Sequence, residues 1–87
     1  MYFIVDTKTQ DVKAYGKQGD AARAALALLN VSTGQGKDPV KAFRELNSDA
    51  VAVLNLSDAF ESVEQSDNHA AQELARSFKE AVEAFYG

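Results

Sequence analysis

The chain has 87 residues, 46% of them apolar, no cysteine and a formal net charge of −4. This length and apolar share predict one folded domain, and they argue against both a disordered chain and a second domain with its own core. The absence of cysteine excludes disulfides, thiolate nucleophiles and Cys-ligated metal sites, and it fits a reducing compartment.

The N-terminal segment is predicted to form a β-hairpin. Residues 2–6 begin with aromatic and β-branched side chains, and a polar turn cluster follows them. Residues 11–15 alternate in polarity, with Val12 and Ala14 on one face. We therefore expect strands over residues 2–6 and 11–15, and a hairpin of this size needs another element packed on one of its faces.

The cover for this hairpin is predicted to be an Ala-rich helix. Asp20 is the expected N-cap of a helix that begins at Ala21, and Asn30 is the expected terminator. The stripe that faces the sheet follows helical spacing and consists of Ala22, Ala25, Leu26 and Leu29. Its small side chains allow the helix to approach the sheet closely.

A flexible loop over residues 31–37 is predicted to precede a second, short helix. Asp38 is the expected N-cap and Pro39 the first helical residue, which is a strong start signal. The Gly-Gln-Gly-Lys run inside the loop invites comparison with a phosphate-binding loop. Val31 stands where that motif needs its first glycine and Asp38 replaces its Ser or Thr, so we reject the comparison.

The segment 48–65 is compatible with two predictions, of which the sequence favours the first. As one helix, it aligns four apolar side chains at spacings of three and four: Val53, Leu56, Phe60 and Val63. In the alternative, residues 50–56 form a third strand beside the hairpin, and Ser57 or Asp58 caps a separate helix.

The C-terminal segment is predicted to form a long helix capped by Ser66 or Asp67. Its apolar residues follow one stripe to the end of the chain: Ala70, Ala71, Leu74, Phe78, Val82 and Phe85. Taken together, these segments predict an α+β domain, in which an N-terminal β-hairpin is covered by Ala-rich helices and a long helix follows.

The charges are unevenly distributed along the chain. Residues 1–46 hold seven Lys or Arg and five Asp or Glu, a net charge of +2, whereas residues 47–87 hold two and eight, a net charge of −6. A row of carboxylates without interleaved basic residues can dock a basic groove on another protein or imitate nucleic-acid phosphates there. The alternative is an ordinary solvated helix face. The predicted partner-binding residues are four carboxylates spaced three apart and one aromatic anchor: Asp58, Glu61, Glu64, Asp67 and Tyr86.

Two other non-catalytic functions fit the composition. The basic half would bind nucleic acid if Tyr2 and Tyr15 of the hairpin served as stacking rings among its lysines and arginines. A homodimer would bury further surface in so small a domain, which makes a self-associating structural module the third hypothesis.

Catalysis and metal binding have little support in the sequence. The single histidine, His69, shares a helical face with Glu73, but two ligands do not make a zinc site. No nucleophile and base pattern accompanies it. We therefore expect a protein that is not an enzyme and that uses no metal or cofactor.

The N-terminal sequence also resembles a known class of proteins. Residues 1–15 run Met-Tyr-Phe-Ile-Val-Asp-Thr-Lys-Thr-Gln-Asp-Val-Lys-Ala-Tyr, and residues 20–30 run Asp-Ala-Ala-Arg-Ala-Ala-Leu-Ala-Leu-Leu-Asn. This pattern resembles the ββα head of small bacteriophage-encoded accessory proteins, with Gln10 where the hairpin usually carries glycine. The resemblance implies a protein that binds and inhibits or modulates a bacterial host enzyme or defence complex. It assigns no functional residue.

No targeting or membrane segment is expected. Asp6 and Lys8 interrupt the apolar start, so the sequence shows no signal-peptide core. The longest apolar run, residues 24–29, is far too short to span a membrane. We therefore expect a cytoplasmic protein, located in the bacterial host cytoplasm if it is phage-encoded.

Overall fold

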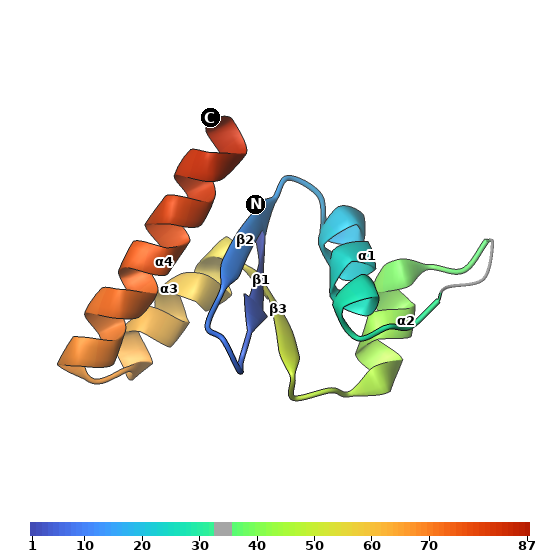
Figure 1. Ribbon diagram of the computed structural model, residues 1–87, viewed down its shortest axis with the longest axis horizontal. Helices are drawn as coiled ribbons and strands as arrows, with labels where there is room; N and C mark the ends of the chain where they lie inside the picture. The colour runs from blue at the N-terminus through green and yellow to red at the C-terminus, as the bar shows by residue number, and fades with distance from the viewer. Residues whose placement is uncertain (33–35) are drawn as a thin grey trace.

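The computed structural model describes residues 1–32 and 36–87. Within these residues the elements follow in the order β1 (Tyr2–Asp6), β2 (Val12–Tyr15), α1 (Gln18–Leu28), α2 (Pro39–Leu46), β3 (Val51–Asn55), α3 (Leu56–Gln65) and α4 (Asn68–Tyr86). The fold is α+β with a long C-terminal helix, as the sequence predicts (Figure 1).

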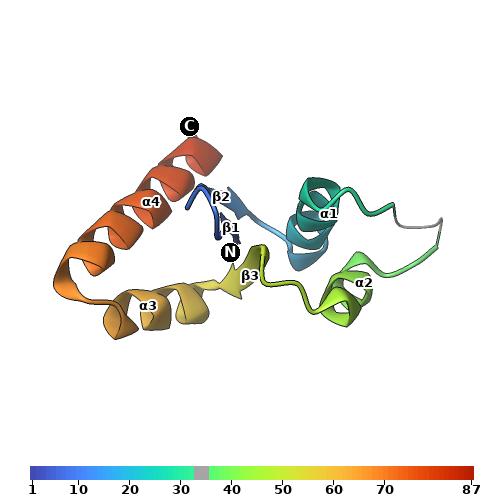
Figure 2. The same ribbon diagram turned by 60° about the horizontal axis from the view of Figure 1, so that its bottom comes forward.

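The three strands form one antiparallel sheet in the order β2-β1-β3, which puts the first strand in the middle. Ile4 of β1 lies opposite Lys13 of β2 on one side and Val53 of β3 on the other. Helices cover both faces, because α1 and α2 lie on one side of the sheet and α3 and α4 on the other (Figures 1 and 2). The sheet is therefore the middle of three layers.

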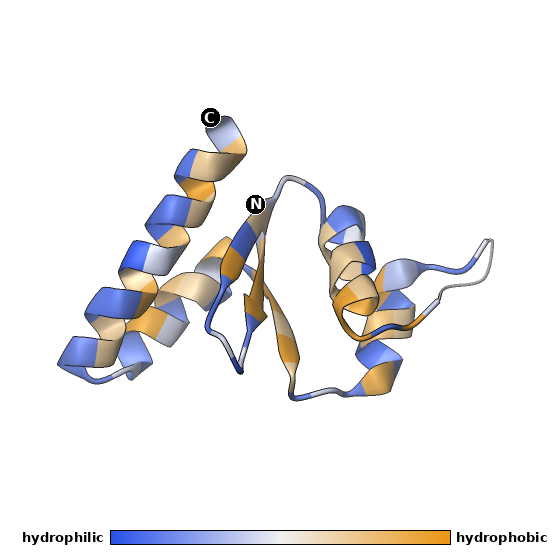
Figure 3. Cartoon of the chain, viewed as in Figure 1, coloured by the Kyte–Doolittle hydropathy of each residue, from blue (hydrophilic) through white to orange (hydrophobic). Residues whose placement is uncertain are grey.

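The alternation of side chains along β1 divides the core into two clusters. Phe3 packs with Ala14, Ala59, Phe78 and Ala81 on the side of α3 and α4. Its neighbour Ile4 packs on the side of α1 with another cluster: Ala21, Ala25 and Val51. Successive side chains of a strand point to opposite faces, so a continuous apolar run suits a central strand that is buried on both sides. Figure 3 shows hydrophobic colours along β1 and β3.

The prediction of one helix over residues 48–65 is wrong, and the alternative strand is present as β3. The helix after this strand is capped by Asn55, whose Oδ1 accepts a hydrogen bond of 2.8 Å from the N–H of Asp58, and not by Ser57 or Asp58 as predicted. Val51 and Val53 pack against the cluster around Ile4, whereas Leu54 packs against the opposite cluster. A helix over this segment would leave the second edge of β1 unpaired. Pairing along that edge therefore outweighs the helical spacing of the apolar residues, because it satisfies backbone groups that would otherwise need other partners.

Two predicted helix starts are confirmed. Asp38 caps α2, and its Oδ1 accepts a hydrogen bond of 3.0 Å from the backbone N–H of Val40. Asp67 caps α4, and its Oδ1 accepts a hydrogen bond of 2.9 Å from the backbone N–H of Ala70. Each cap satisfies one of the backbone donors that a helix leaves free at its N-terminus.

The predicted N-cap of α1 is wrong. The helix begins at Gln18, so Asp20 lies inside the first turn. Its carboxylate accepts a hydrogen bond of 3.1 Å from the guanidinium of Arg23 rather than from the backbone. An acidic side chain anywhere in the first turn interacts favourably with the helix dipole, which explains why Asp20 suits this position without capping it.

The end of α1 is the one that Asn30 predicts. Asn30 adopts the left-handed conformation with a φ of 58°. Its backbone N–H donates to Ala27 over 3.1 Å, and the N–H of Val31 donates to Leu26 over 2.9 Å. This pair of hydrogen bonds is a Schellman motif, in which asparagine replaces the more common glycine.

The helix α4 is amphipathic. Phe78 and Ala81 are buried against the sheet, while most of its charged residues are exposed. Figure 3 shows hydrophilic and hydrophobic stretches alternating along it. Among the helices in the described part of the chain, none combines the length and the apolar character needed to cross a membrane.

Candidate protein-binding surface

The four predicted carboxylates are all exposed, but they do not belong to one element. Asp58, Glu61 and Glu64 lie on α3, whereas Asp67 precedes α4 and caps it. The Asp67 carboxylate therefore has a structural task in holding the start of α4. The other three predicted carboxylates, Asp58, Glu61 and Glu64, have no such capping role.

The carboxylates of α3 are not neutralised by basic residues of the same chain. Within the described residues, the ion pairs join Arg23 to Asp20 and His69 to Glu73, and none involves the carboxylates of α3. Glu61 accepts only a neutral hydrogen bond of 3.2 Å, from the amide of Gln65 one turn later. The negative charge of α3 is thus left available to a partner.

These three carboxylates surround the outer side of α3 rather than forming a single row. Ala59 is buried and marks the side of the helix that faces the core. Each residue turns the helix by about 100°, so Asp58 and Phe60 point in nearly opposite directions. Glu64 lies one turn after Phe60 on the same side. Glu61 lies between Asp58 and Glu64 on the outer side.

Large apolar side chains are exposed beside these charges. The exposed fractions are 63% for Phe60 and 46% for Leu56, both on α3. Tyr86, the predicted aromatic anchor, is 76% exposed and lies edge-on to Phe85, with ring centroids 5.2 Å apart. The helical spacing predicts that Leu56 and Phe60 share one apolar stripe with Val63, which is half-buried. It does not predict that Leu56 and Phe60 are exposed.

An apolar groove separates α3 from α4. Its volume is about 300 Å³, and its apolar lining includes Phe3, Ala59, Phe60, Val63, Phe78 and Val82. Lys79 of α4 is the one charged residue in the lining. Phe3 and Phe78 form part of the floor and are buried, whereas Phe60 is largely exposed. The groove therefore combines a core-like floor with an exposed aromatic side chain.

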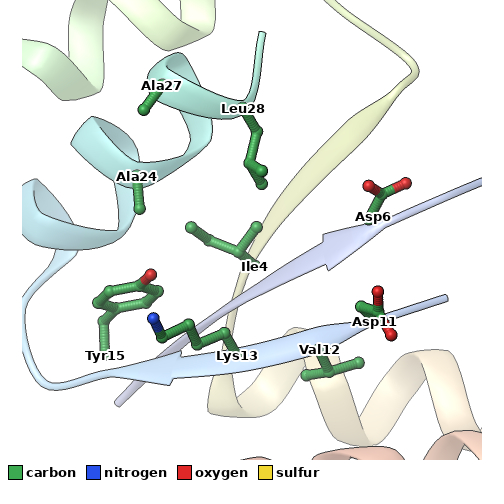
Figure 4. A pocket seen from close by; sticks show the side chains of 9 residues that line it. All are labelled: Ile4, Asp6, Asp11, Val12, Lys13, Tyr15, Ala24, Ala27 and Leu28. Carbon is green, nitrogen blue, oxygen red and sulfur yellow. The ribbon is translucent and has the colours of Figure 1, made fainter. Parts of the chain in front are cut away.

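A second, larger depression lies between β2 and α1 (Figure 4). It has a volume of about 580 Å³, and Ile4, Ala24 and Leu28 contribute apolar surface to it. Its two carboxylates already serve the hairpin turn. Asp6 accepts a hydrogen bond of 2.9 Å from the N–H of Lys8, and Asp11 accepts one of the same length from a threonine hydroxyl.

The tyrosines of the hairpin are not freely presented stacking rings. Tyr2 and Tyr15 are half-buried and pack against the cluster beneath α1. The ammonium of Lys13 lies 5.7 Å from the centroid of the Tyr15 ring, at the range of a cation–π contact. Part of each ring surface that would have to stack on nucleic-acid bases is thus already in contact with other residues of the fold.

His69 lies at the exposed start of α4. Its Nε2 is 3.4 Å from Oε1 of Glu73, and its side chain is 86% exposed. The described residues contain no group of three or more histidine, aspartate and glutamate side chains arranged to hold a metal ion. Part of the glycine-rich run that we compared with a phosphate-binding loop, residues 33–35, lies outside the described residues.

Comparison with known proteins assigns no family. No protein-family model matches the chain, and neither a curated protein nor a solved structure matches it. The resemblance of residues 1–30 to phage accessory proteins therefore stays a prediction.

Proposed function

We propose that this protein is a non-catalytic protein-binding module, and that the acidic outer side of α3 docks a basic surface of another protein. One observation supports this proposal above the others: Asp58, Glu61 and Glu64 are exposed, and no Lys or Arg of the described residues pairs with them. Like charges one turn apart weaken an isolated helix slightly. When a basic partner binds, the same charges attract it, and they also increase the rate of association of the two proteins.

We further propose that the partner is a bacterial enzyme or defence complex, which this protein inhibits or modulates. The support is the resemblance of residues 1–30 to phage accessory proteins. The protein and its partner would then meet in the bacterial cytoplasm. Blocking by charge complementarity needs no catalytic group, which suits a chain without cysteine and with one exposed histidine.

The test compares two variants with the same change of net charge. Glu61→Lys combined with Glu64→Lys reverses the proposed surface, whereas Glu45→Lys combined with Asp49→Lys reverses two exposed acids near α2. Immobilised protein captures partners from bacterial lysate at low and at raised salt, and mass spectrometry quantifies them. The first variant should lose its specific partner by about tenfold or more, and the second should keep it. Equal capture by both variants, with unchanged salt dependence, would refute the proposal.

A further inference from the structure

We propose that the groove between α3 and α4 binds an amphipathic helix of the partner, with apolar side chains on one face and Lys or Arg along one flank. This inference rests on the proposed function, and it adds the kind of segment that is recognised. Binding of an amphipathic helix in an apolar groove is a common mode of peptide recognition, read by anchors at helical spacing.

The walls of the groove carry apolar surface that the fold itself does not use. Phe78 on its floor is 8% exposed, whereas Phe60 on its α3 wall is 63% exposed and Leu56 is 46% exposed. Exposed aromatic side chains beside a concave apolar surface are typical of the centres of protein interfaces. Tyr86 extends this surface, because it lies four residues after Val82 and thus on the same side of α4.

The length of the groove suits a helix of about two turns. Leu56 and Val63 are both in its α3 wall, and their separation along the helix axis is about 10 Å. Ala75 and Val82 span a similar distance along the α4 wall. A partner helix would therefore place two or three successive anchors, one turn apart, between the two walls.

Charge decides which helix fits and how it lies. Glu64 stands one turn after Phe60 on the same side of α3, so this residue makes the rim on the α3 side acidic, while Glu61 lies farther round on the outer side of the helix. The α4 wall carries Lys79 instead. A basic flank on the partner thus belongs above α3. A second copy of this chain would set its own acidic α3 and its net charge of −4 against the same rim, which disfavours it as the occupant.

The test uses a fluorescein-labelled amphipathic peptide with leucines at helical spacing and lysines on the remaining positions. Fluorescence anisotropy measures its affinity for the full chain, and two matched peptides carry Glu for Lys or the same residues in scrambled order. Phe60→Ser should weaken binding by about tenfold or more. Leu28→Ser removes a similarly exposed side chain, 56% exposed, on the other side of the sheet and should leave the affinity unchanged. The Glu-containing and scrambled peptides should bind at least tenfold more weakly.

The outcomes separate this inference from the proposed function. If Phe60→Ser and Leu28→Ser behave alike while reversal of Glu61 and Glu64 still weakens capture of the lysate partner, the groove is overturned and the acidic surface stands. If Phe60→Ser weakens peptide binding and the charge reversal changes nothing, the basic flank is overturned together with the proposed function. A dimer seen by light scattering and abolished by Phe60→Ser would show that a second copy fills the groove, which also overturns the inference.

Discussion

Phe3 of β1 and Phe78 of α4 meet edge to face, with ring centroids 4.9 Å apart and ring planes inclined by 69°. Their exposed fractions are 1% and 8%. This contact joins the central strand to the C-terminal helix, which lie at opposite ends of the sequence. An aromatic pair in this geometry contributes about 0.5–1.5 kcal/mol beyond the burial of its surface.

Removal of the Phe78 ring should therefore unfold most of the population. Phe78→Ala is expected to lower the free energy of unfolding by about 3–5 kcal/mol, which is comparable with the total for a domain of this size. Phe60→Ala removes the same ring from an exposed position, and we expect a loss below about 1 kcal/mol. Urea denaturation followed by circular dichroism measures both changes. Similar losses in the two variants would contradict the different burial of the two rings.

The sequence predicts those elements whose signals are local. The pair Asp38 and Pro39 marks the start of α2 within two residues, and Asn30 marks the end of α1. The sequence favours a helix over the strand β3 because the evidence for this strand is distant: Val53 lies opposite Ile4, which is far away in the chain. The spacing of apolar residues within 48–65 carries no information about the second edge of β1, with which β3 forms hydrogen bonds.

The candidate site also combines features that the sequence predicts with one that it does not predict. The exposure of Glu61 and Glu64 follows from their charge, and the sequence predicts it. The exposure of Phe60 could not be predicted, because phenylalanine is usually a buried residue. In α3 the buried residue is instead the small Ala59, which packs in one cluster with Phe3 and Phe78. Only the position of the sheet against α3 decides which apolar residue is buried.

A second prediction compares two of the aspartates that the sequence predicts as helix caps, Asp38 and Asp20. Asp38→Ala removes the side-chain acceptor for the N–H of Val40 and should cost about 1 kcal/mol of unfolding free energy. Asp20→Ala removes an exposed ion pair with Arg23 and a favourable dipole interaction, and it should cost about 0.5 kcal/mol or less. Thermal and urea denaturation compare the two. A larger loss for Asp20→Ala would mean that its carboxylate does cap α1 in solution.

A third prediction is that the charge of Glu64 lowers the stability of the fold although it favours binding of the partner. This residue lies in the last turn of α3, where the helix has no basic side chain and where Glu61 stands one turn earlier. Glu64→Lys should raise the unfolding free energy by about 0.5 kcal/mol, because it replaces a like-charge pair by an opposite-charge pair and places a cation at the negative end of the helix dipole. The urea midpoint should rise with an unchanged slope, and the gain should shrink at high salt because both effects are screened. A gain that persists undiminished at high salt, or a loss of stability, would contradict this electrostatic account. If the same variant loses its partner while gaining stability, binding rather than folding explains why an acidic residue occupies this position.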